Sequence, residues 1–406
     1  MQSMKTSGQR ATRVPSGWVS ILPLLLLAGL FLWKAQLNYR IHDPINSNFF
    51  SFWLSGQMAW NGQSPYDAAQ FKAGFDAAGA TYRPSKILQY PLPLMYFMAP
   101  LGALPVREGY FAWQLVCEII LAVVVFILLR RQPRTRGLLV PAAAFLLFFG
   151  PVYLSLQIGS VGAISLLAVG LVILFLERGW PISAGLALSV TLLKPPQALA
   201  LLLLAGVWLI ARRQWRAIAG MAAGALVLLA VWLIRDPLGL AKFRSSSDFL
   251  LGHSMGVQSN VYSFAYLACR GNVPCMWALG SVLLVVVLGL GAYALWRNRA
   301  RWDDWEAFNV IIPLGFLCAL YLWSYDQILY VVPVVWIAAR LLIGSRSYVL
   351  PLAFLVLVDL VSLAALTVQA YTQKDLLSVL TTVLVLGMTA WLLRGEQRTV
   401  AEGSSA

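Results

Sequence analysis

The sequence has few of the residue types that bind metals or nucleotides. Only 11% of its 406 residues are charged, and its two histidines, His42 and His253, lie far apart. It contains no His-x-x-x-His, Cys-x-x-Cys or Asp-x-Asp motif, no Walker loop and no Gly-x-Gly-x-x-Gly fingerprint. We therefore expect no metal site and no cofactor, in particular no soluble nucleotide cofactor.

Cysteine is also scarce, with four in the whole chain. That number is too small for a disulfide-based scaffold. Cys117 and Cys318 lie in apolar stretches, where cysteine behaves as a small core residue. Cys269 and Cys275 flank a Gly/Pro turn, so they either form a small disulfide in an oxidising compartment or stay free thiols. The sequence leaves both possibilities open.

Hydrophobic residues, in contrast, make up 60% of the chain, and the mean hydropathy is +0.75. Long apolar runs recur along it, and about 20 such residues in a helix cross a hydrocarbon layer of about 30 Å. The pattern predicts an all-α polytopic membrane protein with about twelve transmembrane helices. The expected spans are 18–37, 108–129, 138–156, 160–177, 181–193, 195–211, 215–235, 276–296, 306–322, 327–343, 348–370 and 375–393.

The basic residues set the expected orientation of these spans. With the proline-rich stretch Pro91–Pro105 treated as embedded but not crossing, 18 of the 30 Lys and Arg residues fall on the side of the N-terminus. Short loops rich in Lys and Arg stay in the cytoplasm. We therefore expect both termini in the cytoplasm of a bacterial cell and the chain in its inner or plasma membrane.

The resulting organisation is one integral-membrane domain over residues 1–393, followed by a disordered cytoplasmic tail at 394–406. The first extracytoplasmic loop covers 38–107 and the second 236–275. Within the first loop, the aromatic segment Phe49–Trp60 is expected to lie in the membrane interface as an amphipathic helix. A loop of this length points to function rather than to a simple connection.

Several polar residues near the outer face are candidates for chemistry. Asp43 follows the first span, where a carboxylate can accept a proton from a hydroxyl nucleophile, unless it only caps the loop. His42 beside it could tune Asp43 or bind phosphate. Asp326 either caps a helix or contributes to the site. Gln157, at the end of a span, and His253, in the second loop, are further substrate-binding candidates.

Lys194 is the most informative cation. It ends an apolar run too short to reach the outer surface and precedes Pro195, Pro196 and Gln197. A cation inside a helix bundle is costly and usually functional, and an anionic headgroup is its expected partner. The alternative is that its side chain extends to the membrane interface.

An ordered series of motifs resembles glycosyltransferase family 87. The series comprises Phe-Phe-Ser-Phe-Trp at 49–53, Tyr-Pro-Leu-Pro at 90–93, Leu-Gln-Ile-Gly-Ser at 156–160, Leu-Leu-Lys-Pro-Pro-Gln at 192–197 and Tyr-Asp-Gln-Ile-Leu at 325–329. The resemblance implies a GT-C fold and an extracytoplasmic transfer of mannose, or of another hexose or pentose, from a polyprenyl-phosphate donor. The acceptor would be a hydroxyl of a glycolipid or polysaccharide, and a single displacement would invert the anomeric carbon.

The family places its catalytic aspartate directly before the aromatic run, where this sequence has Asn48. Asparagine cannot act as a base, so Asp43 is assigned that role. The remaining substrate-binding candidates in the motifs are Asn48 itself, Trp53, Tyr90, Gln197 and Tyr325.

Two other functions stay open from the sequence. A secondary transporter or flippase for lipid-linked sugars would suit twelve spans and a helix break at Pro195-Pro196, although we see no internal repeat. A non-catalytic member of the family would explain Asn48 in place of the aspartate.

Overall fold

The computed structural model describes residues 18–82, 87–130, 133–244, 256–345 and 347–403. Across these ranges the regular structure consists of α-helices and short 3-10 helices, without a β-strand. The predicted all-α membrane architecture is thereby confirmed.

Six helical segments in the described ranges are long and apolar enough to cross a membrane. The segments are α5 (Val106–Leu129), α11 (Trp215–Arg235), α14 (Val273–Arg297), η4 with α16 (Ser324–Ser345), α17 (Val349–Thr372) and the start of the last helix with η5 (Leu376–Arg394). A seventh is possible if α6 (Leu139–Phe148) and α7 (Gly150–Ile158) form one span bent by 59°. Twelve spans therefore stay a prediction.

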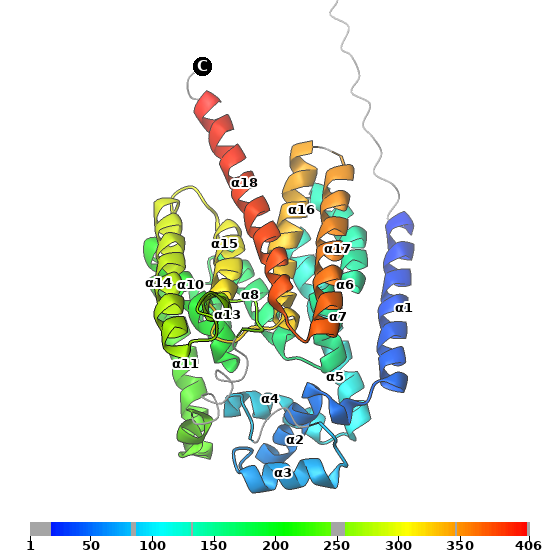
Figure 1. Ribbon diagram of the computed structural model, residues 1–406. Coiled ribbons are helices and arrows are strands. Elements are labelled where there is room, and N and C mark those ends of the chain that lie inside the picture. Colours follow the sequence, from blue (N-terminus) through cyan, green and yellow to red (C-terminus); the bar gives the residue numbers. More distant parts are fainter. Residues whose placement is uncertain (1–17, 83–86, 131–132, 245–255, 346, 404–406) are drawn as a thin grey trace, which may run out of the picture.

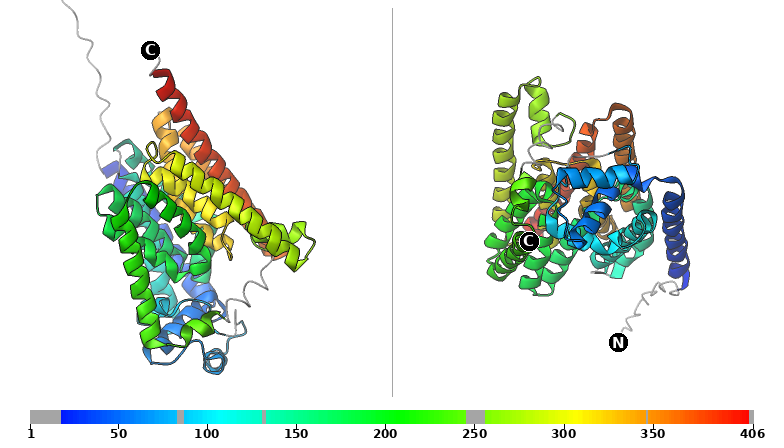
Figure 2. Two further views of the ribbon diagram at one scale, coloured as in Figure 1. Left: turned by 90° about the vertical axis from the view of Figure 1, so that its left-hand side faces the viewer. Right: turned by 90° about the horizontal axis from the view of Figure 1, so that it is seen from below.

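The bundle also contains shorter apolar helices. Four of them, α8 (Gly162–Glu177), α9 (Pro181–Ser189), α10 (Pro195–Ala211) and α15 (Asp304–Leu317), pack among the longer helices. The first helix, α1 (Trp18–Ile41), contacts α5 and α6 and stands at the edge of the bundle (Figure 2). The core is continuous through α5, α8, α15 and α16.

The first loop, defined here as residues 42–90, folds into short helices at one end of the bundle. Helices α2 (Asn48–Trp60) and α3 (Ala68–Ala77) lie there together with α4 (Leu92–Gly102), which follows the loop (Figure 1). The beginning of α1 and the end of α18 (Val379–Gly403) lie at the opposite end. With 11 residues, α4 rises only about 17 Å, which is less than a hydrocarbon layer of about 30 Å.

The helix predicted for Phe49–Trp60 is present as α2, but its surroundings differ from the prediction. We expected one face in the lipid interface, whereas Phe49, Phe50, Phe52 and Met58 are all buried. Their side chains pack against α3, α4 and α5. Phe49, Phe50 and Phe52 therefore form part of a protein core beneath the loop, while Trp60 at the end of α2 stays 72% exposed.

Two helix boundaries also differ from the expected spans. The stretch 138–156 breaks at Phe149, whose backbone is extended, because Pro151 just beyond it cannot donate a helical hydrogen bond and crowds the preceding turn. At the C-terminus, α18 continues to Gly403 through most of the expected disordered tail. Glu, Gln and Arg in that tail favour helix continuation.

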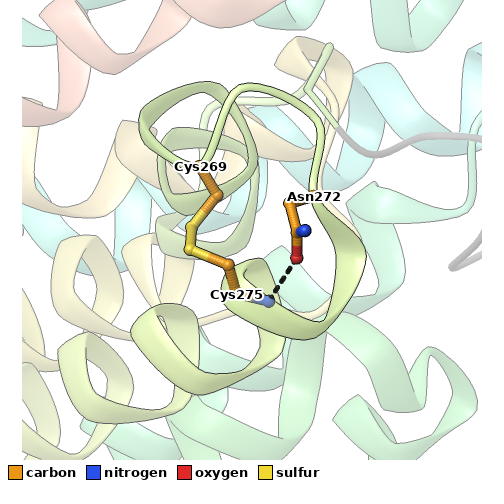
Figure 3. The surroundings of a disulfide bond; sticks show 3 residues. All are labelled: Cys269, Asn272 and Cys275. Atoms are coloured by element: carbon orange, nitrogen blue, oxygen red, sulfur yellow. Dashed lines mark hydrogen bonds between the residues drawn. A yellow bond between two sulfur atoms is a disulfide. The ribbon is translucent and has the colours of Figure 1, made fainter.

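Cys269 and Cys275 form a disulfide in the turn between α13 (Val261–Ala268) and α14, as Figure 3 shows. The side chain of Asn272 caps α14 within this turn by accepting a hydrogen bond from the backbone N–H of Cys275, at 2.9 Å. Of the two possibilities that the sequence left open, the structure has the bonded one.

Helices α9 and α11 approach so closely that only glycine fits at one position. A Cβ atom added at Gly185 would lie 1.9 Å from the carbonyl oxygen of Ala217 and 2.5 Å from the backbone nitrogen of Met221. Small residues allow such contacts between membrane helices.

We expect Gly185→Ala to separate the helices and to destabilise the fold by about 1–3 kcal/mol, measured by thermal unfolding in detergent. Gly206→Ala in α10 is the control, because no atom lies within 4 Å of that Cβ. Equal unfolding midpoints in the two variants would contradict this packing.

Candidate active site

The first loop is held together by hydrogen bonds between its two halves. The side-chain oxygen of Asn46 accepts hydrogen bonds from the backbone N–H groups of Thr81, at 2.8 Å, and Tyr82, at 2.9 Å. The hydroxyl of Tyr66 donates to the carbonyl oxygen of Tyr90, at 2.7 Å. These contacts fix the chain on either side of Asn48, at the start of α2.

The loop is also tied to the end of α11. The hydroxyl of Ser64 donates to the carboxylate of Asp236 at 2.7 Å, and the ring of Tyr66 stacks on that of Trp232. Lys242, in the second loop, lies 3.8 Å from the same aspartate. The two loops thus meet at Asp236, and the first loop has a defined position over the bundle.

A cavity of about 470 Å³ opens where this loop meets the C-terminal helices. Its volume lies in the usual range for small-molecule sites, about 300–1,000 Å³. Four parts of the chain line it, namely the first loop, α7, the stretch 321–325 that leads into η4, and the end of α17 with the residue just past it. The lining residues are His42, Asn46, Ser47, Asn48, Ser51, Phe52, Tyr82, Leu88, Gln89, Tyr90, Leu154, Ile158, Tyr321, Trp323, Tyr325, Gln369 and Gln373.

A buried ion pair lies behind one wall of this cavity. The ammonium of Lys194 pairs with the carboxylate of Asp326, and the two residues are 3% and 0% exposed. The Lys194 nitrogen is 5.0 Å from the ring centre of Tyr325 and 6.0 Å from that of Tyr90. Because both rings line the cavity, the charged pair is separated from it by one aromatic layer.

Two helix breaks bring these charges together. Lys194 stands between η3 (Val190–Leu193) and α10, where Pro195 begins a new helix. Asp326 belongs to η4 (Ser324–Tyr330), and its second carboxylate oxygen accepts a hydrogen bond from the backbone N–H of Trp323 at 3.2 Å. The side chain of Gln197 donates to the carbonyl oxygen of Asp326 at 3.4 Å. The pair is therefore fixed from both helices.

Lys194 is buried, as its short apolar run indicated, but its partner in the structure is a carboxylate. The sequence analysis treated Lys194 and Asp326 separately because they are 132 positions apart. Buried charges are tolerated when paired, and this pair keeps a cation inside the bundle without a ligand. Asp326 also caps η4, so its predicted capping role and a role beside the cavity coexist.

Asp43 lies at the rim and does not line the cavity. Its exposed side chain caps η1 (Pro44–Asn46), where one oxygen accepts from the N–H of Ile45 at 3.0 Å and the other from the amide of Asn46 at 2.6 Å. The residues on either side of this short turn, His42 and Asn46, do line the cavity. The carboxylate is thus accessible and next to the site.

His42 lines the cavity and stacks on the ring of Tyr110, with 5.4 Å between the ring centres. Its Nε2 atom is buried and has no hydrogen-bond partner in the part of the chain that the structure describes. Burial lowers the pKa of His42, and the charge of Asp43 opposes this shift only in part. The imidazole is therefore neutral at neutral pH and offers a hydrogen bond rather than a charge.

The other predicted site residues divide into two groups. Asn48, Tyr90 and Tyr325 line the cavity, as does His42. Trp53 instead faces α4 and α5, where its indole nitrogen donates to the carbonyl oxygen of Leu104 at 3.0 Å. Gln157 does not line the cavity either, and its backbone carbonyl accepts a hydrogen bond from the hydroxyl of Tyr110 at 2.6 Å. His253 lies outside the described residues.

One wall of the cavity was missed by the sequence analysis. Gln369 and Gln373, near the end of α17, line it together with Trp323. The hydroxyl of Ser324 donates to Gln369 at 2.8 Å, and the backbone N–H of Ser324 hydrogen-bonds to the carboxylate of Asp375. The available signal was weak, because α17 also carries Asp359 and Ser362 and ends at Thr372, so that Gln373 lies just past the helix in a left-handed conformation.

The described residues contain no group of three or more His, Cys, Asp or Glu side chains that could hold a metal ion. The polar groups at the cavity are amides, phenols, the hydroxyls of Ser47 and Ser51, one indole, one imidazole and, at the rim, one carboxylate. Such a set can bind sugar hydroxyls and accept a proton from one of them.

The comparison with known families agrees with three of the five motifs, those at 90–93, 156–160 and 192–197. The model of glycosyltransferase family 87 matches residues 88–319, which is more than half of the chain and includes Tyr90, Lys194 and Gln197. No curated protein and no solved structure matches the chain. The extent of the family match shows that this membrane protein belongs to glycosyltransferase family 87.

Proposed function

We propose that the protein transfers a sugar from a polyprenyl-phosphate donor to a hydroxyl of a lipid- or envelope-linked acceptor. The proposal rests on the cavity of about 470 Å³ between the first loop and the aromatic wall in front of Lys194 and Asp326. It rests equally on the membership of the chain in a glycosyltransferase family. The sugar is mannose or another hexose or pentose, as the family resemblance implies.

In this proposal Asp43 is the general base. A base must reach the acceptor hydroxyl, and Asp43 is exposed at the rim between two cavity-lining residues. Asp326 is fully enclosed and neutralised by Lys194, so it cannot meet an acceptor without a rearrangement. A single displacement with Asp43 as base inverts the anomeric carbon.

Lys194 acts on the leaving group. Departure of a polyprenyl phosphate builds up negative charge, which preorganised positive charge stabilises in a site that excludes water. In this proposal a phosphate that rests on the rings of Tyr90 and Tyr325 competes with Asp326 for the ammonium behind them, because the ion pair is neutral as a whole. His42 and Asn48 supply neutral hydrogen bonds to the sugar or the phosphate.

The reaction takes place on the extracytoplasmic side of a bacterial cell membrane, with both termini in the cytoplasm. Supporting this orientation, the ends of α1 and α18 that carry the termini lie opposite the first loop (Figure 1). The disulfide between Cys269 and Cys275 also fits an oxidising compartment outside the cell.

The test uses the purified full-length protein in proteoliposomes with a panel of polyprenyl-phosphate-linked sugars and a glycolipid acceptor. We expect a glycosylated acceptor from at least one donor and no accumulation of intact donor in the inner leaflet. Movement of donor between the leaflets without any product would instead identify a flippase.

A further inference from the structure

A second cavity, of about 400 Å³, lies at the end of the bundle opposite the first loop. It is formed where α14 ends, where the following turn leads into α15, and where α18 passes these two helices (Figure 1). Its lining contains three arginines, Arg297, Arg301 and Arg394, which come from three different segments. The site is distinct from the candidate active site, with which it shares no residue.

The positive charge of this cavity is not balanced within its lining. No carboxylate is found among its described lining residues. The acidic residues that follow Arg301 are engaged in the fold, since Asp303 caps α15 by accepting from the N–H of Glu306 and Asp304 accepts from the indole of Trp208. The guanidinium of Arg297 donates to the hydroxyl of Tyr293 at 2.9 Å and keeps further donors free.

Apart from Asn298, the remaining lining residues of the cavity are apolar. Val310, Leu386, Ala390 and Leu393 line it, and Trp302 lies at the same site. A ligand that fits must therefore combine a compact negative charge with hydrocarbon. Guanidinium groups match phosphate oxygens in a bidentate geometry, and arginine is the residue best suited to this contact.

We propose that this cavity binds the phosphate headgroup of an anionic phospholipid, with the arginines on the phosphate and the apolar wall along the first acyl carbons. Arginines at the cytoplasmic side of a membrane protein are expected from topology alone. All three are themselves exposed, but they converge from three segments on one concave site with an apolar wall, which topology alone does not predict. Free inorganic phosphate shares the charge but cannot use the apolar wall.

Native mass spectrometry of the detergent-solubilised full-length protein tests this proposal. Phosphatidylglycerol, phosphatidylcholine and inorganic phosphate are titrated separately against wild type and against a variant with Arg297→Gln, Arg301→Gln and Arg394→Gln. We expect one tightly bound phosphatidylglycerol in the wild type and about tenfold weaker binding of it in the variant, because charge-assisted hydrogen bonds are lost. Phosphatidylcholine and inorganic phosphate should bind weakly to both.

The matched control carries Arg134→Gln, Arg178→Gln and Arg216→Gln, which removes the same charge from exposed positions outside the cavity. It should bind phosphatidylglycerol like the wild type. Equal losses in the two triple variants would show a general charge effect and overturn the proposal, as would binding of inorganic phosphate with no preference for the lipid. If the cavity variant fails to fold, Arg301→Gln alone, at an exposed position, should still weaken phosphatidylglycerol binding, and unchanged binding there overturns the proposal.

Discussion

Lys194→Ala is expected to abolish sugar transfer and to destabilise the protein by about 3–5 kcal/mol, since it leaves the carboxylate of Asp326 buried without its partner. A variant that does not fold says nothing about catalysis. The informative variant is therefore Lys194→Met combined with Asp326→Leu, which replaces the buried pair by apolar side chains of similar size. Its unfolding midpoint should approach that of the wild type, because such replacements of buried pairs are often neutral.

If the pair serves the reaction, the stable double variant still transfers no sugar. Lys194→Arg keeps the positive charge but replaces the ammonium by a planar guanidinium, so it should retain part of the activity. Normal turnover of the lipid-linked donor by the double variant would show that Lys194 and Asp326 are only structural. The readout is the rate of product formation at saturating donor, compared with thermal unfolding of the same preparations.

Asp43→Asn is expected to reduce the transfer rate by about 10²–10⁴-fold, the usual contribution of a general base. The fold should be unaffected, because asparagine also caps a helical turn and Asp43 is exposed. Asp67→Asn is the matched control, since Asp67 also caps a helix of the first loop and lies outside the cavity lining. It should retain full activity.

Asn48→Asp restores the carboxylate that the family places before the aromatic run. Asn48 lines the cavity and begins α2, where an acidic residue is favourable for the helix dipole. The variant should fold normally and transfer at least as fast as the wild type.

Full activity in Asp43→Asn would show that another carboxylate is the base, with Asp326 the next to test. An inactive wild type that gains activity with Asn48→Asp would identify a degenerate family member.

The helical architecture could be predicted because hydropathy is a local property of the sequence. Most helix limits fall within a few residues of the apolar runs, and the burial of Lys194 followed from the length of the run before it. The break at Phe149 was missed because one proline in an apolar stretch can either kink or end a helix. The burial of α2 against α4 was missed because an apolar helix face has the same sequence pattern whether it packs against protein or against lipid.

The candidate site was predictable only in part, for a physical reason. The cavity residues come from several segments that lie far apart in the sequence, and only tertiary packing decides which of them meet. Lys194 and Asp326 each carried a signal, but no local pattern joins them. Gln369 and Gln373 carried a weak signal, and their place in the cavity depends on how α17 packs against α6 and α7.

The central claim is that a lipid-linked sugar reacts in the cavity beneath the first loop. A polyprenyl-phosphate sugar with a photoreactive group on the sugar tests it directly, with labelled peptides identified by mass spectrometry after irradiation. We expect labels within residues 42–52 and 321–325, which line the cavity, and their loss when unlabelled donor is added in excess. Labelling confined to other parts of the protein, or labelling that excess donor does not reduce, would contradict this account of the site.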